Sequence, residues 1–416
     1  MYSYDTGGPF GLEDQVSTSG PGMALIYQML IPLFWCIPIA LVASELTTAM
    51  PVQGGFYRWT RAAFGDMWGF LAGWWNWLTS FFLGGAYAAL LADYAAPQVA
   101  HWKHYCIAVF AILIITYVNV RGIQMTGRLA IVAELAILAI VFAMCVMSVR
   151  VWTYNPFVPV VAPHKSIFQV FGVGFAIGLW LYAGYEQLSS VAEEIENPQR
   201  NYPRALAWVV PLSILTYVLP TICSLAVMGH WDRWHDGTFS DAAMLIGGWR
   251  LRLAITLAAG VMSLATLNST VLSATRMPFA MAQDGYLPAA LTRIHRKFGT
   301  PWISILLSAG AYCLLSWFPF AELISIYVWL RVATSVMTVL SAWQLRRKHP
   351  DLQRTFRIPW GRKGLAYAVI APLMMSGIAI ITSDKLAREW GPILLLSGPA
   401  AYFLRLSIPK TLPSDS

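Results

Sequence analysis

The feature that most constrains this chain is a series of long apolar runs. Each run is long enough to cross a bilayer as a helix, which takes roughly 17–25 residues. The composition agrees, because 57% of the residues are hydrophobic, only 12% are charged and the mean hydropathy is +0.58. The sequence therefore predicts an all-α polytopic membrane protein. The runs cover residues 22–43, 67–96, 104–120, 129–149, 167–185, 203–229, 251–275, 302–318, 321–343, 364–382 and 390–406.

The Lys and Arg residues between these runs predict the orientation. If the short opening segment also crosses the membrane, most of the 28 Lys and Arg residues fall in connections on one side, which the positive-inside rule assigns to the cytoplasm. This bias predicts twelve crossings of the cell membrane, with the N- and C-termini both cytoplasmic. Anionic lipid headgroups then account for the net charge of +8, so the expected partner of the basic loops is the lipid bilayer and not nucleic acid.

Several motifs are better explained by structure than by chemistry. The five cysteines form no close-spaced pair, which argues against a disulfide framework or a zinc site. The segment HWDRWHD at 230–236 offers two His and two Asp side chains, but a solvated loop explains it better than a metal site does. In GVGFAIG at 172–178, Gly174 and Gly178 are expected to let helices approach closely, not to bind a dinucleotide.

No enzyme activity is predicted from the chain. A nucleophile–base pair or a metal constellation at membrane depth would be needed, and neither an HExxH motif nor a pair of histidines within one apolar run is present. We therefore expect no catalytic residues, no metal and no cofactor.

Charged residues within the apolar runs are the first candidates for function, because they are costly there. Glu45 and Glu322 lie near the ends of their runs and are expected to reach an interface. Glu134 lies about 10 Å into its helix, counted from Gly127 at 1.5 Å per residue, so a functional role is expected for it. Arg331 is expected to pair with one of the acids within the runs.

Two segments each combine a glycine-rich break with acids that follow it. In residues 178–198, GLWLYAGYEQLSSVAEEIENP, the chain changes from apolar to polar at Gly184, and TGGPFGLED at 6–14 has the same character. A spanning helix that turns polar halfway is expected to be discontinuous and to line a cavity. Two such helices, about five spans apart, are typical of a secondary transporter with an inverted repeat, in which freed backbone groups bind the charged ends of small solutes.

Five stretches carry a resemblance to a known family. They are GGPFGLED at 7–14, PVQGGFYRWTRAAFG at 51–65, WGFLAGWWNWL at 68–78 with ADY at 92–94, GYEQLSSVAEEIENPQRNYPRA at 184–205, and RMPFAMAQDGYLPAAL at 276–291. In these stretches the chain resembles the amino acid–polyamine–organocation (APC) transporter superfamily. It looks closest to the branch of polyamine and cationic amino acid permeases.

The resemblance implies a fold and a division of the chain. The fold is a five-plus-five inverted repeat with discontinuous helices 1 and 6 and two extra C-terminal helices. Residues 1–416 would form a single membrane transport domain, with repeats at 1–150 and 160–348 and the extra helices at 362–406. On this alignment residues 7–11 lie in the middle of helix 1, so its inner half would need roughly ten more residues. Helix 1 is thus expected to be truncated, with a start upstream of Met1 or a shortened gate.

The resemblance also implies a substrate site. Backbone amides at the helix 1 break would meet a substrate carboxylate, and the helix 6 break would hold the other end. Trp180 matches an aromatic position that lies over the substrate and can offer a cation–π face. The expected substrate-binding residues are Gly7, Gly8, Phe10, Gly11, Glu13, Trp180, Tyr182, Ala183, Gly184, Tyr185, Asn268 and Thr270.

Glu134 and Glu186 are the expected proton-coupling residues. Glu186 matches an acid that some relatives use in proton sensing, whereas Glu134 stands where several proton-coupled relatives carry a lysine. The lysine mechanism therefore cannot be transferred unchanged. The predicted function is secondary active transport by alternating access, with protons as the coupling partner. An exchanger without proton coupling and a sensor with a transport fold remain alternatives.

Two substrate classes remain open at this point, both of them small organic amines. Glu13, Asp14 and Glu186 would give the cavity an acidic lining, which favours cationic amino acids or polyamines. The N-terminus of a half-helix favours a carboxylate instead, which keeps neutral amino acids in view. Ile39 stands where the polyamine branch often carries an extra acid, and this departure weakens the polyamine interpretation.

Overall fold

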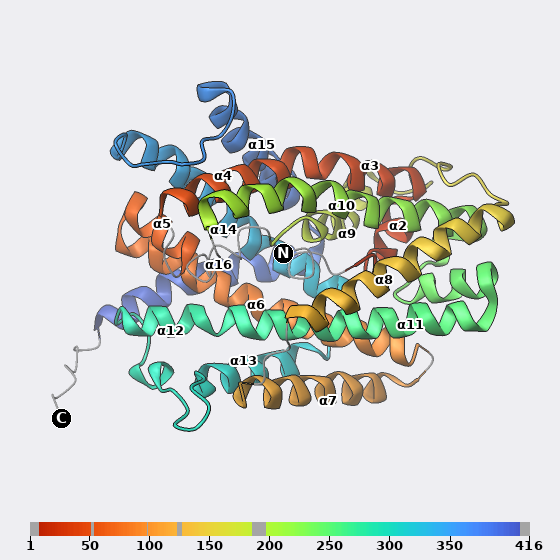
Figure 1. The fold of residues 1–416 in the computed structure, drawn as a ribbon, viewed down its shortest axis with the longest axis horizontal. Helices are drawn as coiled ribbons and strands as arrows, with labels where there is room; N and C mark the ends of the chain where they lie inside the picture. The colour runs from red at the N-terminus through yellow and green to blue at the C-terminus, as the bar shows by residue number, and fades with distance from the viewer. Residues whose placement is uncertain (1–7, 51–53, 98, 123–126, 185–196, 408–416) are drawn as a thin grey trace.

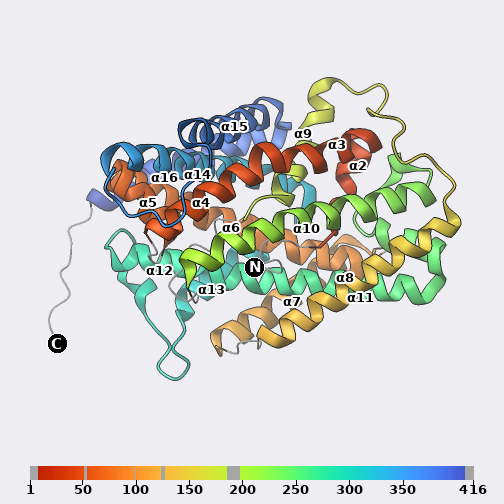
Figure 2. The same cartoon turned by 45° about the horizontal axis from the view of Figure 1, so that its top comes forward.

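The computed structural model describes residues 8–50, 54–97, 99–122, 127–184 and 197–407. These parts of the chain form helices and no strand, and most of the long helices run along the longest axis of the molecule (Figures 1 and 2). Within the described ranges, seven helices are long and apolar enough to cross a membrane. The prediction of an all-helical polytopic membrane protein is therefore confirmed.

The helices fall in this order along the chain. The first part contains α2 (Glu13–Ser19), α3 (Pro21–Ile31), η1 (Pro32–Cys36), α4 (Ile37–Ala49), α5 (Gly55–Phe64), α6 (Asp66–Ala95), α7 (His101–Val120), α8 (Gly127–Ser148) and η2 (Val149–Val151). The second part contains α9 (Ile167–Leu181), α10 (Pro198–Val227), η4 (Trp231–Arg233), α11 (Thr238–Ala274), α12 (Arg276–Gln283), η5 (Ala289–Thr292), α13 (Trp302–Leu315), α14 (Phe320–Lys348), α15 (Gly361–Thr382) and α16 (Lys385–Ser407).

Two helix ends lie where the sequence indicates breaks. Gly8 and Gly11 have φ angles of 65° and 85° in a turn that precedes α2, a conformation that favours glycine. Helix α9 ends at Leu181, and Tyr182 to Gly184 are not helical. Both ends lie in the interior of the bundle, where backbone groups without a helical partner face other protein groups instead of lipid.

The two interrupted segments pack against each other through small residues. The side chain of Ser19 on α2 donates a hydrogen bond to the carbonyl of Val170 on α9 at 2.7 Å, and Gln15 Nε2 donates to the carbonyl of Gly174 at 3.0 Å. A Cβ atom on Gly174 would lie 1.9 Å from Ser19 Oγ, and one on Gly178 would lie 2.8 Å from Gln15 Nε2. The expected close approach at these two glycines is therefore confirmed.

The centre of the bundle is formed by α6, α11 and α14. Helix α6 packs along both α14 and α11, and α14 also contacts α9. In Figure 1, α5 and α12 lie together at one end of the long axis, while α2 lies toward the other. We call these the α5 end and the α2 end.

Glu45 is fully buried near the α5 end, so the expectation that it reaches an interface is wrong. Its carboxylate accepts hydrogen bonds from Arg346 Nε at 2.7 Å and from the backbone N–H of Ile358 at 2.8 Å, and it lies 3.4 Å from Arg354 Nε. The side chain therefore ties α4 to the end of α14 and to the connection that follows it. Glu322, by contrast, is exposed.

Replacing Glu45 with Gln is expected to lower the free energy of unfolding by about 3 kcal/mol, because it leaves two arginines beside an uncharged, buried partner. Thermal unfolding in detergent would measure the loss. The matched control is Glu389→Gln, whose exposed pairing with Lys385 is 3.9 Å long and is expected to contribute less than about 1 kcal/mol. Equal stability of the two variants would contradict a structural role for Glu45.

Candidate functional site

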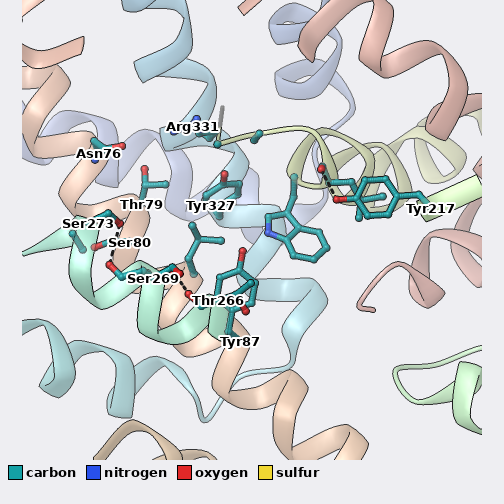
Figure 3. Close-up of a pocket in the computed structure, with 17 residues that line it drawn as sticks. Asn76, Thr79, Ser80, Tyr87, Tyr217, Thr266, Ser269, Ser273, Tyr327 and Arg331 are labelled. Atoms are coloured by element: carbon teal, nitrogen blue, oxygen red, sulfur yellow. Dashed lines mark hydrogen bonds between the residues drawn. The ribbon is translucent and has the colours of Figure 1, made fainter. Parts of the chain in front are cut away.

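A small cavity of about 60 Å³ lies among α6, α11, α14 and the end of α9 (Figure 3). We call it the central cavity. Polar and aromatic side chains line it at membrane depth, where polar groups are costly and usually functional. The lining residues are Asn76, Thr79, Ser80, Leu83, Tyr87, Trp180, Leu181, Ala183, Gly184, Tyr217, Thr266, Ser269, Thr270, Ser273, Ala274, Tyr327 and Arg331.

Two polar stripes lie next to each other in the lining of the central cavity. Asn76, Thr79 and Ser80 recur on α6 at helical spacing, so they share one face of that helix. A matching stripe on α11 contains Thr266, Ser269, Thr270 and Ser273, and Figure 3 shows the two stripes close to each other. The stripes therefore present several hydroxyl groups and one amide to the same small space.

Most of these hydroxyl groups use their proton within their own helix. Each donates to a backbone carbonyl three or four residues earlier, so its oxygen keeps lone pairs that can accept from a ligand. The walls are thus rich in acceptors, which suits a ligand that carries N–H donors. The donor–acceptor distances are 2.7 Å for Thr79 to Trp75, 2.6 Å for Ser80 to Trp77, 2.9 Å for Thr266 to Met262, 2.8 Å for Thr270 to Thr266 and 3.2 Å for Ser273 to Thr270.

Aromatic rings close the cavity toward the α2 end. The ring of Trp180 lies 6.1 Å from that of Tyr87 and 5.0 Å from that of Phe320, measured between centroids. Tyr217 is held by a hydrogen bond from its hydroxyl to the carbonyl of Leu181 at 3.0 Å. A cation in the cavity would therefore meet aromatic faces as well as oxygen acceptors.

Arg331 brings a guanidinium group to the same cavity. The side chain extends from α14, one helical turn beyond Tyr327, and only 2% of the residue is exposed. Guanidinium groups have donors and no acceptor, and they bind carboxylates well. The central cavity thus combines an acceptor-rich wall with one strong donor.

The residues singled out from the sequence fall into different places. Trp180, Ala183, Gly184 and Thr270 line the central cavity, whereas Tyr182 is turned away and donates its hydroxyl hydrogen to the carbonyl of Gln28 at 2.6 Å. Of the others, Gly7, Tyr185 and Glu186 lie outside the described residues.

The turn before α2 lies beside the central cavity and does not line it. The ring of Phe10 packs edge-on against Tyr94 at 5.3 Å and Phe239 at 6.5 Å. Gly8 faces Met262 on α11, and a Cβ atom on Gly11 would lie 2.9 Å from Phe320. The ring of Phe320 can therefore pack over the turn because residue 11 is a glycine and has no Cβ atom.

Glu13 makes the connections that hold this turn in place. Its carboxylate accepts hydrogen bonds from the hydroxyl of Tyr94 on α6, from the backbone N–H of Gly11 at 2.8 Å and from that of Gly237 at 3.2 Å. The residue has no exposed surface. Among the described residues, Glu13 therefore joins the turn to α6 and to the loop before α11, and it does not line the central cavity.

Asn268 and Glu134 also lie away from the central cavity. Asn268 accepts a hydrogen bond from Asn119 Nδ2 on α7 at 2.7 Å, on the side of α11 that faces that helix. Glu134 lies on α8, which packs against α10 and α11, and only 9% of it is exposed. Any coupling role of Glu134 would therefore act from outside the lining of the cavity.

Several lining residues were not singled out from the sequence. Asn76, Thr79 and Ser80 stand in NWLTS at 76–80, and the other stripe stands in TLNSTVLS at 266–273. The usable signal was the spacing of small polar residues three and four apart within otherwise apolar runs.

The fold and the cavity together describe a helical membrane protein that can enclose a small polar solute. The chain belongs to the amino acid permease family, whose family model matches residues 6–390. It is a transporter and not an enzyme. The recognised resemblance to the APC superfamily is thereby confirmed.

Relatives with assigned names agree with this family. The chain is 32% identical over 414 residues to a protein named "Probable polyamine transporter" from Arabidopsis thaliana, covering 96% of this chain and 84% of that protein. It is 30% identical over 395 residues to a polyamine transporter of the same plant, covering 92% and 79% of the two chains. It is 22% identical over 400 residues to the methylthioribose transporter of Bacillus subtilis, covering 90% and 83%.

We expect Glu13→Ala to lower the free energy of unfolding by about 1–3 kcal/mol, because a buried hydroxyl and two backbone N–H groups lose their acceptor. Thermal unfolding of the purified protein in detergent would test this. Asp232→Ala is a suitable control, because Asp232 is an exposed acid at the same end of the molecule. If both substitutions left the unfolding temperature unchanged, the connecting role of Glu13 would be refuted.

Proposed function

We propose that this protein is a secondary active transporter that moves a small organic amine, a polyamine or an amino acid, by alternating access. The observation that carries the proposal is the lining of the central cavity. Its hydroxyl groups already donate their protons to backbone carbonyls, so their oxygens remain as acceptors. An ammonium group has three N–H donors and no acceptor, so it is the natural complement of such walls. Aromatic rings at Trp180 and Tyr87 add cation–π faces.

Within the organic amines, polyamines are the favoured class. Relatives named polyamine transporters align with more than nine-tenths of this chain, and the described lining of the central cavity is richer in acceptors than in donors. Arg331 is the feature that favours an amino acid instead, because a guanidinium binds a carboxylate. Competition between the two substrate classes separates these possibilities.

The proposed architecture is the five-plus-five inverted repeat in twelve crossings. Two features support it. Short helix α5 precedes long helix α6, and the first part of α11 is likewise set off from the rest by a kink at Gly248, where φ is 71°. Moreover, α6 and the long part of α11 each contribute a polar stripe to the lining of one cavity.

The α5 end is proposed to face the cytoplasm, with both termini on that side of the cell membrane. Basic side chains gather there, among them Arg58 and Arg61, which both pair with Asp284 at 3.0 and 3.2 Å. The positive-inside rule assigns such an end to the cytoplasm. Substrate would then enter from the α2 end, past Phe320 and Trp180, whose rings would act as a gate.

The direct test is uptake by the purified protein reconstituted in liposomes. Labelled putrescine is expected to accumulate when an inward proton gradient is imposed, and unlabelled spermidine is expected to compete far better than leucine. Competition by leucine alone would place the protein among the amino acid carriers. Absence of flux for both substrates would favour the transport-fold sensor.

Proton coupling is proposed to run through Glu134, with Glu186 as the second candidate. If it does, Glu134→Gln should abolish uptake driven by a pH gradient while leaving exchange of labelled for unlabelled amine largely intact, because only the coupled proton is lost. Both modes can be measured in the same liposomes. Full pH-driven uptake by the variant would exclude Glu134, and loss of both modes would indicate a structural defect. A wild-type protein that exchanges but never responds to a pH gradient would be an exchanger.

A further inference from the structure

A second and larger cavity, of about 330 Å³, lies at the α2 end. We call it the outer cavity. It is bounded by α2, the end of α6, the start of α7, the loop before α11 and the turn between α13 and α14. Its size is at the lower end of the range for small-molecule sites, roughly 300–1,000 Å³. Phe320 belongs to its wall and also contacts Trp180 of the central cavity, so the two cavities are neighbours separated by aromatic rings.

Three carboxylates line the outer cavity, and no Lys or Arg is among its described lining residues. Asp93 is matched by His104, whose Nδ1 lies 3.0 Å from its carboxylate. The other ring nitrogen of His104 contacts the carbonyl of Ala96, so this side chain offers nothing further to the cavity. His101 and His235 also line the outer cavity, so its three carboxylates share the described lining with three imidazoles and with no permanently charged cation.

Asp236 has a carboxylate oxygen without a partner. Its Oδ1 is closed off from solvent and accepts no hydrogen bond within the described parts of the chain. Burial, and then the negative charges of Asp14 and Glu13, raise the pKa of Asp236 well above its usual range. A cation bound in the cavity beside the Asp236 carboxylate would lower the cost of burying its charge.

The position of Asp236 is determined by its neighbour in the chain. The backbone N–H of Gly237 donates to the buried carboxylate of Glu13, so the loop before α11 is tied to the turn before α2. Asp236 is thereby held over the outer cavity in advance of any ligand. Preorganisation of this kind raises affinity, because little ordering remains to be done on binding.

We infer that the outer cavity is a second ammonium site, which takes one cationic end of a polyamine while the other end enters the central cavity. Two kinds of group suit this ligand. The carboxylates of Asp14 and Asp236 suit its charge and its N–H donors, and the rings of Tyr105, Trp317 and Phe320 suit its methylene chain. A bound divalent metal is less well matched, because no group of three metal-ligating side chains is assembled within the described residues. The inference rests on the function proposed above for its substrate class and for the binding of an amine in the central cavity.

The test is to measure the binding of spermidine and of propylamine to the purified protein by calorimetry in detergent. Asp236→Asn is expected to weaken spermidine binding about tenfold, the size of effect that loss of one charged hydrogen bond produces, and to change propylamine binding less than twofold. Asp232→Asn, in the same loop but exposed and outside the cavity lining, is the matched control and should leave both affinities unchanged. If Asp236→Asn does not fold, Asp14→Asn takes its place, with the same expected split.

Three outcomes would overturn the inference. They are an unchanged spermidine affinity in Asp236→Asn, an equal loss for both amines, and an Asp236-dependent site that binds Mg²⁺ or Ca²⁺ alone but not spermidine. Uptake measurements keep this result separate from the proposed function. Spermidine binding that depends on Asp236 without any flux would refute transport and leave the site, whereas flux with an insensitive Asp236 would refute the site alone.

Discussion

The structure depends on one buried carboxylate, that of Glu13. It gathers the backbone N–H of Gly11, the hydroxyl of Tyr94 and the backbone N–H of Gly237 around two oxygens with no exposed surface. These three donors belong to the turn before α2, to α6 and to the loop before α11. Because one side chain binds all three, it holds in place the turn on which Phe320 packs, and the ring of Phe320 lies between the two cavities.

If the protein carries an amine as we propose, the two cavities would divide the recognition of that amine between them. The central cavity offers hydroxyl oxygens, aromatic faces and one guanidinium, while the outer cavity concentrates carboxylates. A long cation with charges at both ends would gain from each, whereas a short one would use only one. Selectivity for the length of the polyamine would then follow from the distance between the two cavities. The described lining of the central cavity would need no carboxylate for this.

The sequence predicts the class of fold well and the site in part. The apolar runs predict a helical membrane protein, GGPFG predicts a break that appears in the described residues as a turn at 8–11, and the spacing of Gly174 and Gly178 predicts a close helix contact. The polar stripes on α6 and α11 could not be paired from sequence, because about 190 residues separate them. Asn268 shows a second limit: it stands two residues from Thr266 and from Thr270, about 200° around the helix, so it faces α7 while they face the cavity. Likewise, no local pattern links Glu13 to Gly237.

The proposed function requires an ammonium group to bind between the hydroxyl stripes of α6 and α11. An experimental structure of the protein at saturating spermidine tests it most directly. We expect ligand density under the ring of Trp180, within hydrogen-bonding distance of Thr79 or Ser80 on α6 and of Thr270 or Ser273 on α11. An empty central cavity in a protein shown to transport spermidine would contradict it.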